Sequence, residues 1–246
     1  MTTIVIQEHP EKIRFPLMED RTVGFILAFM AGLLNAWTLA HAQTFATVQS
    51  GNVVQSGYRL VQGDWPAFVF SLGSVLAFGL GSGLCGMLMT TMLRGGRVFT
   101  PVVLGFECVA LAGLGVASRL GVIDPHVVAY AVSFVAGAQG NAFHKNHGML
   151  YGNVAVTFVV QMAFNFLVQG LFKKNGINSE PNLMWAGVFF SVLLGFAAGG
   201  GLGFYVDLNV LNHASLFISA ALALILTAMA LRNPKTADPT QGGLIG

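Results

Sequence analysis

The chain has 246 residues, of which 54% are hydrophobic and 9% are charged, and its formal net charge is +2. Soluble domains carry about 25% charged residues, so this chain cannot cover its surface with charge and is expected to lie in a lipid bilayer. Its 12 Lys and Arg residues are scattered over the loops without a basic stripe, so no nucleic-acid partner is expected. The composition predicts an all-α polytopic membrane protein.

The two ends of the chain differ from the apolar region between them. Residues 1–21 are rich in charge and lack the apolar core of a signal peptide. We expect them to form a cytoplasmic tail, with a short interfacial element at 13–18. Residues 233–246 hold prolines and terminal glycines, which predict a disordered C-terminal tail.

Eight candidate membrane segments follow one another, at 22–41, 46–62, 66–93, 98–120, 124–144, 149–172, 183–206 and 212–232. A spanning helix needs about 20 apolar residues, and most of these segments reach that length. The segment 46–62 is short and polar, so it is expected to be an interior helix or a re-entrant half-helix enclosed by protein. The apolar length of 149–172 indicates that this segment can span.

The basic residues predict the orientation, because Lys and Arg collect on the cytoplasmic side of membrane proteins. If all eight segments cross, nine Lys and Arg residues lie inside and three outside. If 46–62 and 149–172 both re-enter, six helices cross and the split is ten to two. Both arrangements place both termini in the cytoplasm, so the charges leave the number of crossings open.

Short motifs of the first half return in the same order in the second half. SGNVV at 50–54 returns as YGNVA at 151–155, and FMAG at 29–32 returns as FVAG at 134–137. Phe70-Ser71 matches Phe190-Ser191, and glycines 79, 81 and 83 match glycines 199, 201 and 203.

This order predicts a duplication inside one membrane domain of residues 22–232, with repeat A at 22–120, repeat B at 124–232 and a polar broken or re-entrant segment in each half. Internal repeats with interrupted helices at corresponding positions are typical of transporters with a site near the bilayer midplane. Eight crossings would make the two halves parallel, and six would make them inverted.

The motifs AGLLNAWTL, SGNVVQSG, GAQGNAF and YGNVAV, in this order, resemble the YoaK-like family of bacterial integral membrane proteins. The resemblance covers residues 22–231 and implies a multi-pass protein of the bacterial inner membrane. The family has no established biochemical role, so the resemblance implies an architecture and no substrate. The family pattern has an aspartate at the position of Asn35, and threonines at those of Ser50 and Tyr151. The missing carboxylate puts ion coupling at Asn35 in doubt.

Uncharged polar side chains collect on the two interrupted segments and form the candidate ligand-binding set. Asn and Gln each offer donors and an acceptor, and the adjacent Gly51 and Gly152 let the backbone leave helical geometry. Such a set can line a cavity for a small polar or amphipathic solute, and the same side chains can also bond one helix to another. Its members are Asn35, Gln49, Ser50, Asn52 and Gln55 in the first half, and Gln139, Asn141, Asn153 and Thr157 in the second.

Glu107 is the only carboxylate in the middle of a strongly apolar run. Because a charge at the bilayer centre is costly, such residues normally face an interior or a water-filled cavity. Glu107 is therefore the candidate for proton coupling. The alternative is a structural carboxyl that anchors neighbouring helices.

Several further residues have structural interpretations. Histidines 41, 144, 147 and 213 lie at segment ends and are expected to bond to backbone rather than to metal. The small-residue pairs Gly79/Gly83 and Gly199/Gly203 predict close helix crossings. Both cysteines, Cys85 and Cys108, are expected to pack as small apolar residues. Trp65 and Trp185 are expected to be interface anchors, and Trp37 to wall a cavity beside Asn35.

The function that these observations favour is a small-molecule transporter or permease, with a polar uncharged site between the two halves. A non-transporting membrane sensor, scaffold or assembly protein is the alternative. We expect no enzyme, cofactor or metal, because no convincing Ser-His pair, carboxylate pair or metal cluster is present. The expected partners are the lipid bilayer and an unidentified solute, and the exposed apolar helices are compatible with a homodimer.

Overall fold

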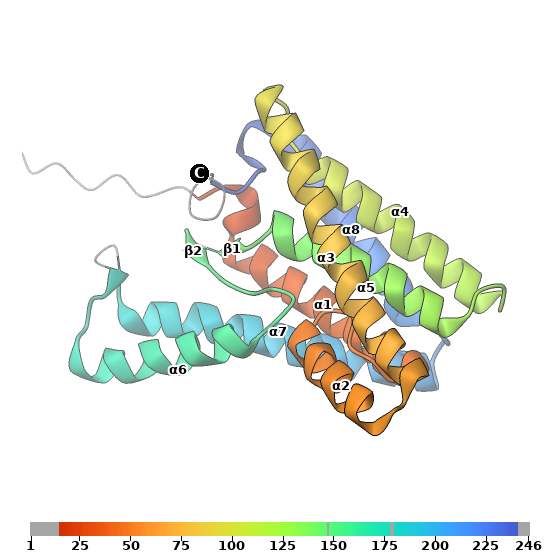
Figure 1. Ribbon diagram of the computed structural model, residues 1–246. Coiled ribbons are helices and arrows are strands. Elements are labelled where there is room, and N and C mark those ends of the chain that lie inside the picture. The colour runs from red at the N-terminus through yellow and green to blue at the C-terminus, as the bar shows by residue number, and fades with distance from the viewer. Residues whose placement is uncertain (1–14, 147, 178–179, 241–246) are drawn as a thin grey trace, which may run out of the picture.

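The computed structural model describes residues 15–146, 148–177 and 180–240, and this part of the chain forms eight α-helices (Figure 1). They are α1 (Arg21–Ala42), α2 (Gln49–Gln62), α3 (Trp65–Arg94), α4 (Thr100–Arg119), α5 (Pro125–Ala142), α6 (Thr157–Phe172), α7 (Asn182–Asn209) and α8 (Ala214–Arg232). Two short 3-10 helices flank them, η1 (Leu17–Glu19) and η3 (Pro234–Thr236). A small antiparallel hairpin of β1 (Lys145–Asn146) and β2 (Met149–Leu150) follows α5.

The prediction of an all-α multi-pass membrane protein is confirmed. Among the described residues, the helices α1, α3, α4, α7 and α8 are long and apolar enough to cross a membrane. The remaining three are shorter: α5 has 18 residues, α6 has 16 and α2 has 14. Since a span needs about 20 residues, α2 and α6 are too short to cross on their own.

The expected segment 149–172 is not one helix. Its first part forms β2 and a loop, and α6 begins only at Thr157. Asn153 lies in that loop, where its side-chain amide donates to the carbonyl oxygen of Phe143 at 2.8 Å. The polar Gly152-Asn153 pair thus interrupts a run that its apolar length alone would predict to be a helix.

Aspartates placed before apolar runs start three of the helices. Asp20, Asp64 and Asp124 are the N-caps of α1, α3 and α5, and each accepts a hydrogen bond from a backbone N–H of the first turn. Capping satisfies donors that the helix itself leaves unpaired. Gly63 ends α2 at φ 74°, a left-handed conformation that glycine adopts without strain.

The two most extensively packed helix pairs, α1 with α7 and α3 with α5, run parallel. A β-carbon at Gly195 of α7 would meet Phe25 of α1, and one at Gly203 would meet Leu33 and Ala36, so both helices advance together. Likewise, Gly73 of α3 contacts Tyr130 of α5, and Ser82 donates to Asn141 at 3.4 Å.

Two other contacts are antiparallel. Gln139, near the end of α5, donates to the carbonyl oxygen of Leu27 in the first half of α1 at 3.2 Å. Gly115 near the end of α4 faces Phe217 at the start of α8, and Gly105 faces Thr227 farther along α8. Therefore α1 and α5 have opposite directions, as do α4 and α8.

Each parallel pair crosses at the same four-residue motif, Phe-x-x-Gly. A β-carbon at Gly32 of α1 would meet the carbonyl oxygen of Phe196 of α7, and one at Gly199 would meet that of Phe29. The crossing of α3 and α5 has the same reciprocal contacts, of Gly81 with Phe134 and of Gly137 with Phe78. Small residues permit such close approach of two backbones.

The expected glycine pairs are right in one helix and wrong in the other. Gly199 and Gly203 both lie at the α1 crossing, but β-carbons at Gly79 and Gly83 would meet nothing within 4 Å. Of the glycines 79, 81 and 83 in α3, it is Gly81 that contacts α5. The reason is helical geometry, because only one side of α3 faces α5, and residues two apart lie on different faces.

The C-terminal tail is ordered as far as Thr240, contrary to the expectation of disorder. Asp238 accepts backbone N–H groups of Phe99 and Thr100 at the start of α4, at 3.1 and 2.9 Å. Glu19 accepts from the backbone of Gly148 and from Thr240, and Lys145 donates to the Thr240 carbonyl at 2.6 Å. The two ends of the membrane domain therefore meet at one end of the bundle (Figure 1).

Of the two tryptophans predicted to be interface anchors, Trp65 is 60% exposed at the start of α3. Trp185 is buried against Phe166 and Phe189 and is not at an exposed interface. Trp37 is also fully buried, in a cluster with Leu34, Val128 and Val132.

Candidate functional site

Of the first-half polar residues, Gln49 and Asn52 belong to a buried hydrogen-bonded network with Thr44 and Ser74. The side-chain amide of Asn52 donates to the carbonyl oxygen of Phe45 at 2.6 Å, to Oε1 of Gln49 at 2.9 Å and to Oγ of Ser74 at 3.1 Å. Its oxygen accepts from the Thr44 hydroxyl at 3.0 Å. Asn52 is fully buried, and this environment satisfies it.

Asn35 fixes the loop 43–48 against α1. Its Nδ2 donates to the Thr47 hydroxyl at 2.6 Å, and its Oδ1 accepts from the Thr47 backbone N–H at 3.1 Å. One turn later, the Thr38 hydroxyl accepts from the backbone N–H of Ala46 at 3.2 Å. The loop therefore runs back along α1 before α2 begins.

These contacts decide how the first-half set is arranged. Asn35, Gln49 and Asn52 are brought together, and their amides bond to protein groups. Ser50 is exposed and lies apart from them, while Gln55 lines a separate pocket described below. In this conformation, Asn35 and Asn52 hold the loop 43–48 and α2 in place.

The second-half residues lie elsewhere. Gln139 bonds to α1 and Asn153 to the Phe143 carbonyl, whereas Asn141 has weaker contacts with Ser82 at 3.4 Å and the sulfur of Met89 at 3.5 Å. Asn153 precedes α6, whereas Asn52 is inside α2, and Thr157 is the first residue of α6. Because Asn52 lies beside the end of α1 and Asn153 follows the end of the antiparallel α5, the two Gly-Asn motifs do not meet in one site.

Near Asn153 some polar atoms are buried without a hydrogen-bond partner in the part of the chain that the structure describes. They are Oε1 of Gln139 and both polar atoms of the Asn146 side chain. Asn146 and the Tyr151 hydroxyl lie against Gly24 of α1, where a side chain would displace them. An unpaired buried polar group costs about 1–3 kcal/mol, so these atoms reduce the stability of the fold.

Sequence reasoning missed Asn146 and Tyr151 as buried polar residues. Tyr151 belongs to the repeated YGNVA motif, in which the sequence signal was its departure from the family pattern. Asn146 had no such signal, because it lies in the short hairpin after α5, where polar residues are common.

Glu107 is buried at 1% exposure, and neither carboxyl oxygen has a hydrogen-bond partner among the described residues. Its electrostatic neighbour is Cys85 of α3, whose thiol also contacts the Asn141 side chain. Such a carboxyl is costly as an anion, which is the usual setting of a proton carrier in a membrane.

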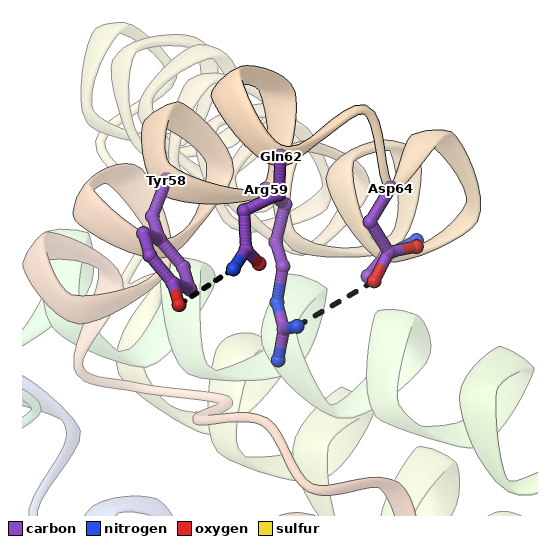
Figure 2. A network of polar contacts seen from close by, with 5 residues as sticks. Tyr58, Arg59, Gln62 and Asp64 are labelled. Atoms are coloured by element: carbon purple, nitrogen blue, oxygen red, sulfur yellow. Dashed lines mark hydrogen bonds and ion pairs between the residues drawn. The ribbon is translucent and has the colours of Figure 1, made fainter.

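A pocket of about 730 Å³ opens between α2 and the first turns of α3 and α5, and we call it the α2–α3–α5 pocket. Its polar lining includes Arg59, Asp64, Gln55 and His126, and its aromatic lining includes Trp65 and Tyr130. Figure 2 shows Arg59 reaching toward Asp64, with Nη1 and Oδ2 3.5 Å apart. Beside them the Gln62 side chain donates to the Tyr58 hydroxyl at 2.7 Å.

A second pocket, of about 480 Å³, lies between the first turns of α1 and α7, and we call it the α1–α7 pocket. Arg21, Phe25 and Ser191 belong to its lining. The two pockets lie at opposite ends of the bundle, because the first turns of α1 and of the antiparallel α5 are at opposite ends.

The histidine predictions are confirmed at two positions. Nδ1 of His41 and Nδ1 of His144 lie 2.9 and 2.8 Å from the carbonyl oxygens of Trp37 and Asn141. His213 instead accepts from the indole N–H of Trp37 at 3.0 Å, and His147 lies outside the described residues. Burial, followed by the nearby His41, lowers the pKa of His213. No cluster of three metal-ligating side chains occurs within the described residues.

The helices and their contacts define a multi-pass α-helical membrane protein with a pocket at each end of the bundle. The chain belongs to the family described as protein of unknown function (DUF1275), whose model matches residues 23–229. No curated protein and no solved structure matches the chain.

Proposed function

We propose that the protein is a transporter or permease for a small solute, built from two inverted halves, 22–120 and 124–232. The observation that carries the proposal is the pair of reciprocal Phe-x-x-Gly crossings. If α5 is the counterpart of α1, and α3 the counterpart of α7, the α1–α7 crossing corresponds to the α5–α3 crossing. Both crossings then have the same reciprocal contacts between Phe and Gly.

The directions of the helices support the same exchange. Equivalent helices α1 and α5 are antiparallel, as are α4 and α8, which is what a two-fold axis in the membrane plane requires. Inverted repeats of this kind are typical of secondary transporters, in which one half rocks against the other.

The short helices α2 and α6 fit as equivalent re-entrant segments. Asn52 of α2 bonds to Ser74 of α3, while Arg59, farther along α2, pairs with Asp64 before α3. Like α2 on α3, α6 packs on the long helix that follows it, α7, where Phe166 stacks on Trp185 and Phe189. Six helices then cross, and both chain termini lie on one side, the cytoplasmic side of a bacterial inner membrane.

The two pockets support a route with an opening at each end. Arg21 and Phe25 precede Phe29 by eight and four residues, and His126 and Tyr130 precede Phe134 by eight and four. In the register of the crossings, Trp65 and Phe70 of one pocket precede Phe78 by thirteen and eight residues, and Leu183 and Val188 of the other precede Phe196 by thirteen and eight. Equivalent pockets at opposite ends are what alternating access needs, with Glu107 as the proton-coupling residue.

The test is solute flux through the purified full-length protein in liposomes. Liposomes loaded with a mixture of amino acids, organic acids and amines are diluted into buffer, and the solutes that leave are identified by mass spectrometry. Transport predicts selective, saturable efflux of one solute class above that of empty liposomes. Efflux equal to that of empty liposomes for every solute contradicts the proposal and favours a sensor or scaffold.

A further inference from the structure

We infer that the α2–α3–α5 pocket binds a small zwitterionic solute with an apolar body, of the chemical class of an apolar α-amino acid. The inference rests on the proposed function, since it names the substrate class of one opening of that route.

The charges of the pocket are of both signs and only loosely paired. The 3.5 Å between the side chains of Arg59 and Asp64 is longer than the 2.7–2.9 Å typical of charge-assisted hydrogen bonds. Their side chains are 42% and 40% exposed, so both remain accessible to a ligand. The Arg59 guanidinium has five N–H donors, and this pair uses one of them.

A zwitterion satisfies both groups at once. A guanidinium binds a carboxylate through two parallel hydrogen bonds, and Asp64 accepts from an ammonium group. In an α-amino acid the two charged groups are attached to the same carbon, which suits two protein charges this close together. A ligand with one charge would separate the existing pair and leave one protein charge without a partner.

The remaining walls suit an apolar or aromatic side chain. The rings of Phe70 and Tyr130 lie 5.3 Å apart, and those of Phe70 and His126 4.4 Å apart, beside the exposed Trp65. Aromatic rings at these separations pack favourably against one another and against a guest. The volume of about 730 Å³ falls within the range of small-molecule sites, which is about 300–1,000 Å³.

Other charged groups at the pocket leave this balance unchanged. Asp124 caps α5 and contacts His126 at 3.0 Å, and the backbone and side chain of His126 lower the pKa of the Asp124 carboxyl. The His126–Asp124 contact is thus already made within α5. Arg59 and Asp64 are left as the two groups that face an incoming zwitterion.

The experiment measures the thermal unfolding midpoint of the purified full-length protein in detergent with three ligands of one shape. L-Phenylalanine carries both charges, phenylacetate only the negative one and phenethylamine only the positive one. We expect millimolar phenylalanine to raise the midpoint by several degrees, and each single-charge analogue to raise it by less than a third as much. Equal stabilisation by an analogue, or none by any of the three, overturns the inference.

Variants locate the site. Arg59→Gln and Asp64→Asn should each weaken phenylalanine binding at least tenfold by calorimetric titration. Asn is as good an N-cap as Asp, so the second change removes the charge and keeps the start of α3. Arg94→Gln, at the exposed far end of α3, is the matched control and should bind as the parent does. A monodisperse elution profile establishes that each variant is folded, and unchanged affinity in both pocket variants contradicts the inference.

Two further arms separate this inference from its neighbours. The first arm measures the thermal midpoint in nanodiscs that contain phosphatidylethanolamine. If this lipid raises the midpoint and added phenylalanine then has no further effect, the pocket binds a lipid headgroup and the inference is overturned. If phenylalanine binds in a way that depends on Arg59 but no solute crosses the liposome membrane, the binding site is supported and transport is contradicted. If other solutes cross and Arg59→Gln leaves their flux unchanged, transport is supported and the binding site is contradicted.

Discussion

Asn52 donates or accepts four side-chain hydrogen bonds while fully buried, so its replacement has a clear expected effect. Asn52→Ala leaves the Phe45 carbonyl and the Thr44 hydroxyl without this partner. We expect a loss of about 2–4 kcal/mol in the free energy of unfolding, since each unsatisfied buried group costs about 1–3 kcal/mol. Ser50→Ala, two residues away and exposed, is the control and should change stability by less than about 0.5 kcal/mol. Wild-type stability in Asn52→Ala, measured by denaturant unfolding in detergent, would contradict this structural role.

His213 gives a pH dependence of known sign. Its pKa is lowered by burial and then by His41, with Arg119 acting in the same direction and Asp207 against it. The unfolded chain therefore binds a proton more readily than the folded one. The stabilisation is present above the ordinary pKa of 6.5 and is lost as the pH falls toward the lowered value. We expect the midpoint to fall between pH 7 and 5, and to fall less in His213→Asn. An identical pH profile in the variant would refute the assignment.

At the scale of elements, two glycines of one helix, two residues apart, should respond differently to substitution. A β-carbon at Gly81 would meet the Phe134 carbonyl, whereas one at Gly79 would meet nothing within 4 Å. Gly81→Ala should destabilise the protein by about 1–3 kcal/mol, the usual range for overpacking. Gly79→Ala should be neutral or stabilising by up to about 1 kcal/mol, because alanine favours a helix. Thermal midpoints in the same detergent compare the two, and equal losses would contradict the crossing described here.

The glycines also show where sequence reasoning succeeds. Apolar length and composition predicted the membrane helices, and the repeated Phe-x-x-Gly motif at 29–32 and 134–137 lies at both crossings. The register of Gly79, Gly81 and Gly83 could not be predicted, since which of them faces α5 depends on the rotation of α3 in the bundle. The Asn52 network was equally hidden, because its partners Phe45 and Ser74 come from different elements and include a backbone oxygen.

For the whole molecule, Glu107 should link transport to protons. Glu107→Gln replaces a buried carboxyl with a neutral group of the same shape. We expect efflux from liposomes to lose its dependence on an imposed pH gradient, while exchange of solute between the two sides persists. Stability should stay the same or rise, since the carboxyl has no hydrogen-bond partner among the described residues. A gradient dependence that survives the change would assign proton coupling to another residue.

The most direct test of the inverted architecture is the side of the membrane on which α2 and α6 end. Gln62 and Lys173 are both exposed at these ends. Each position is replaced by a single cysteine in a chain that also has Cys85→Ala and Cys108→Ala. The cysteines are then labelled with a membrane-impermeant maleimide, first in intact cells and then after the cells are permeabilised. Six crossings and inverted halves predict that Gln62→Cys is labelled from outside and Lys173→Cys only after permeabilisation. Labelling of both from the same side would indicate eight crossings and parallel halves, and would contradict the inverted arrangement.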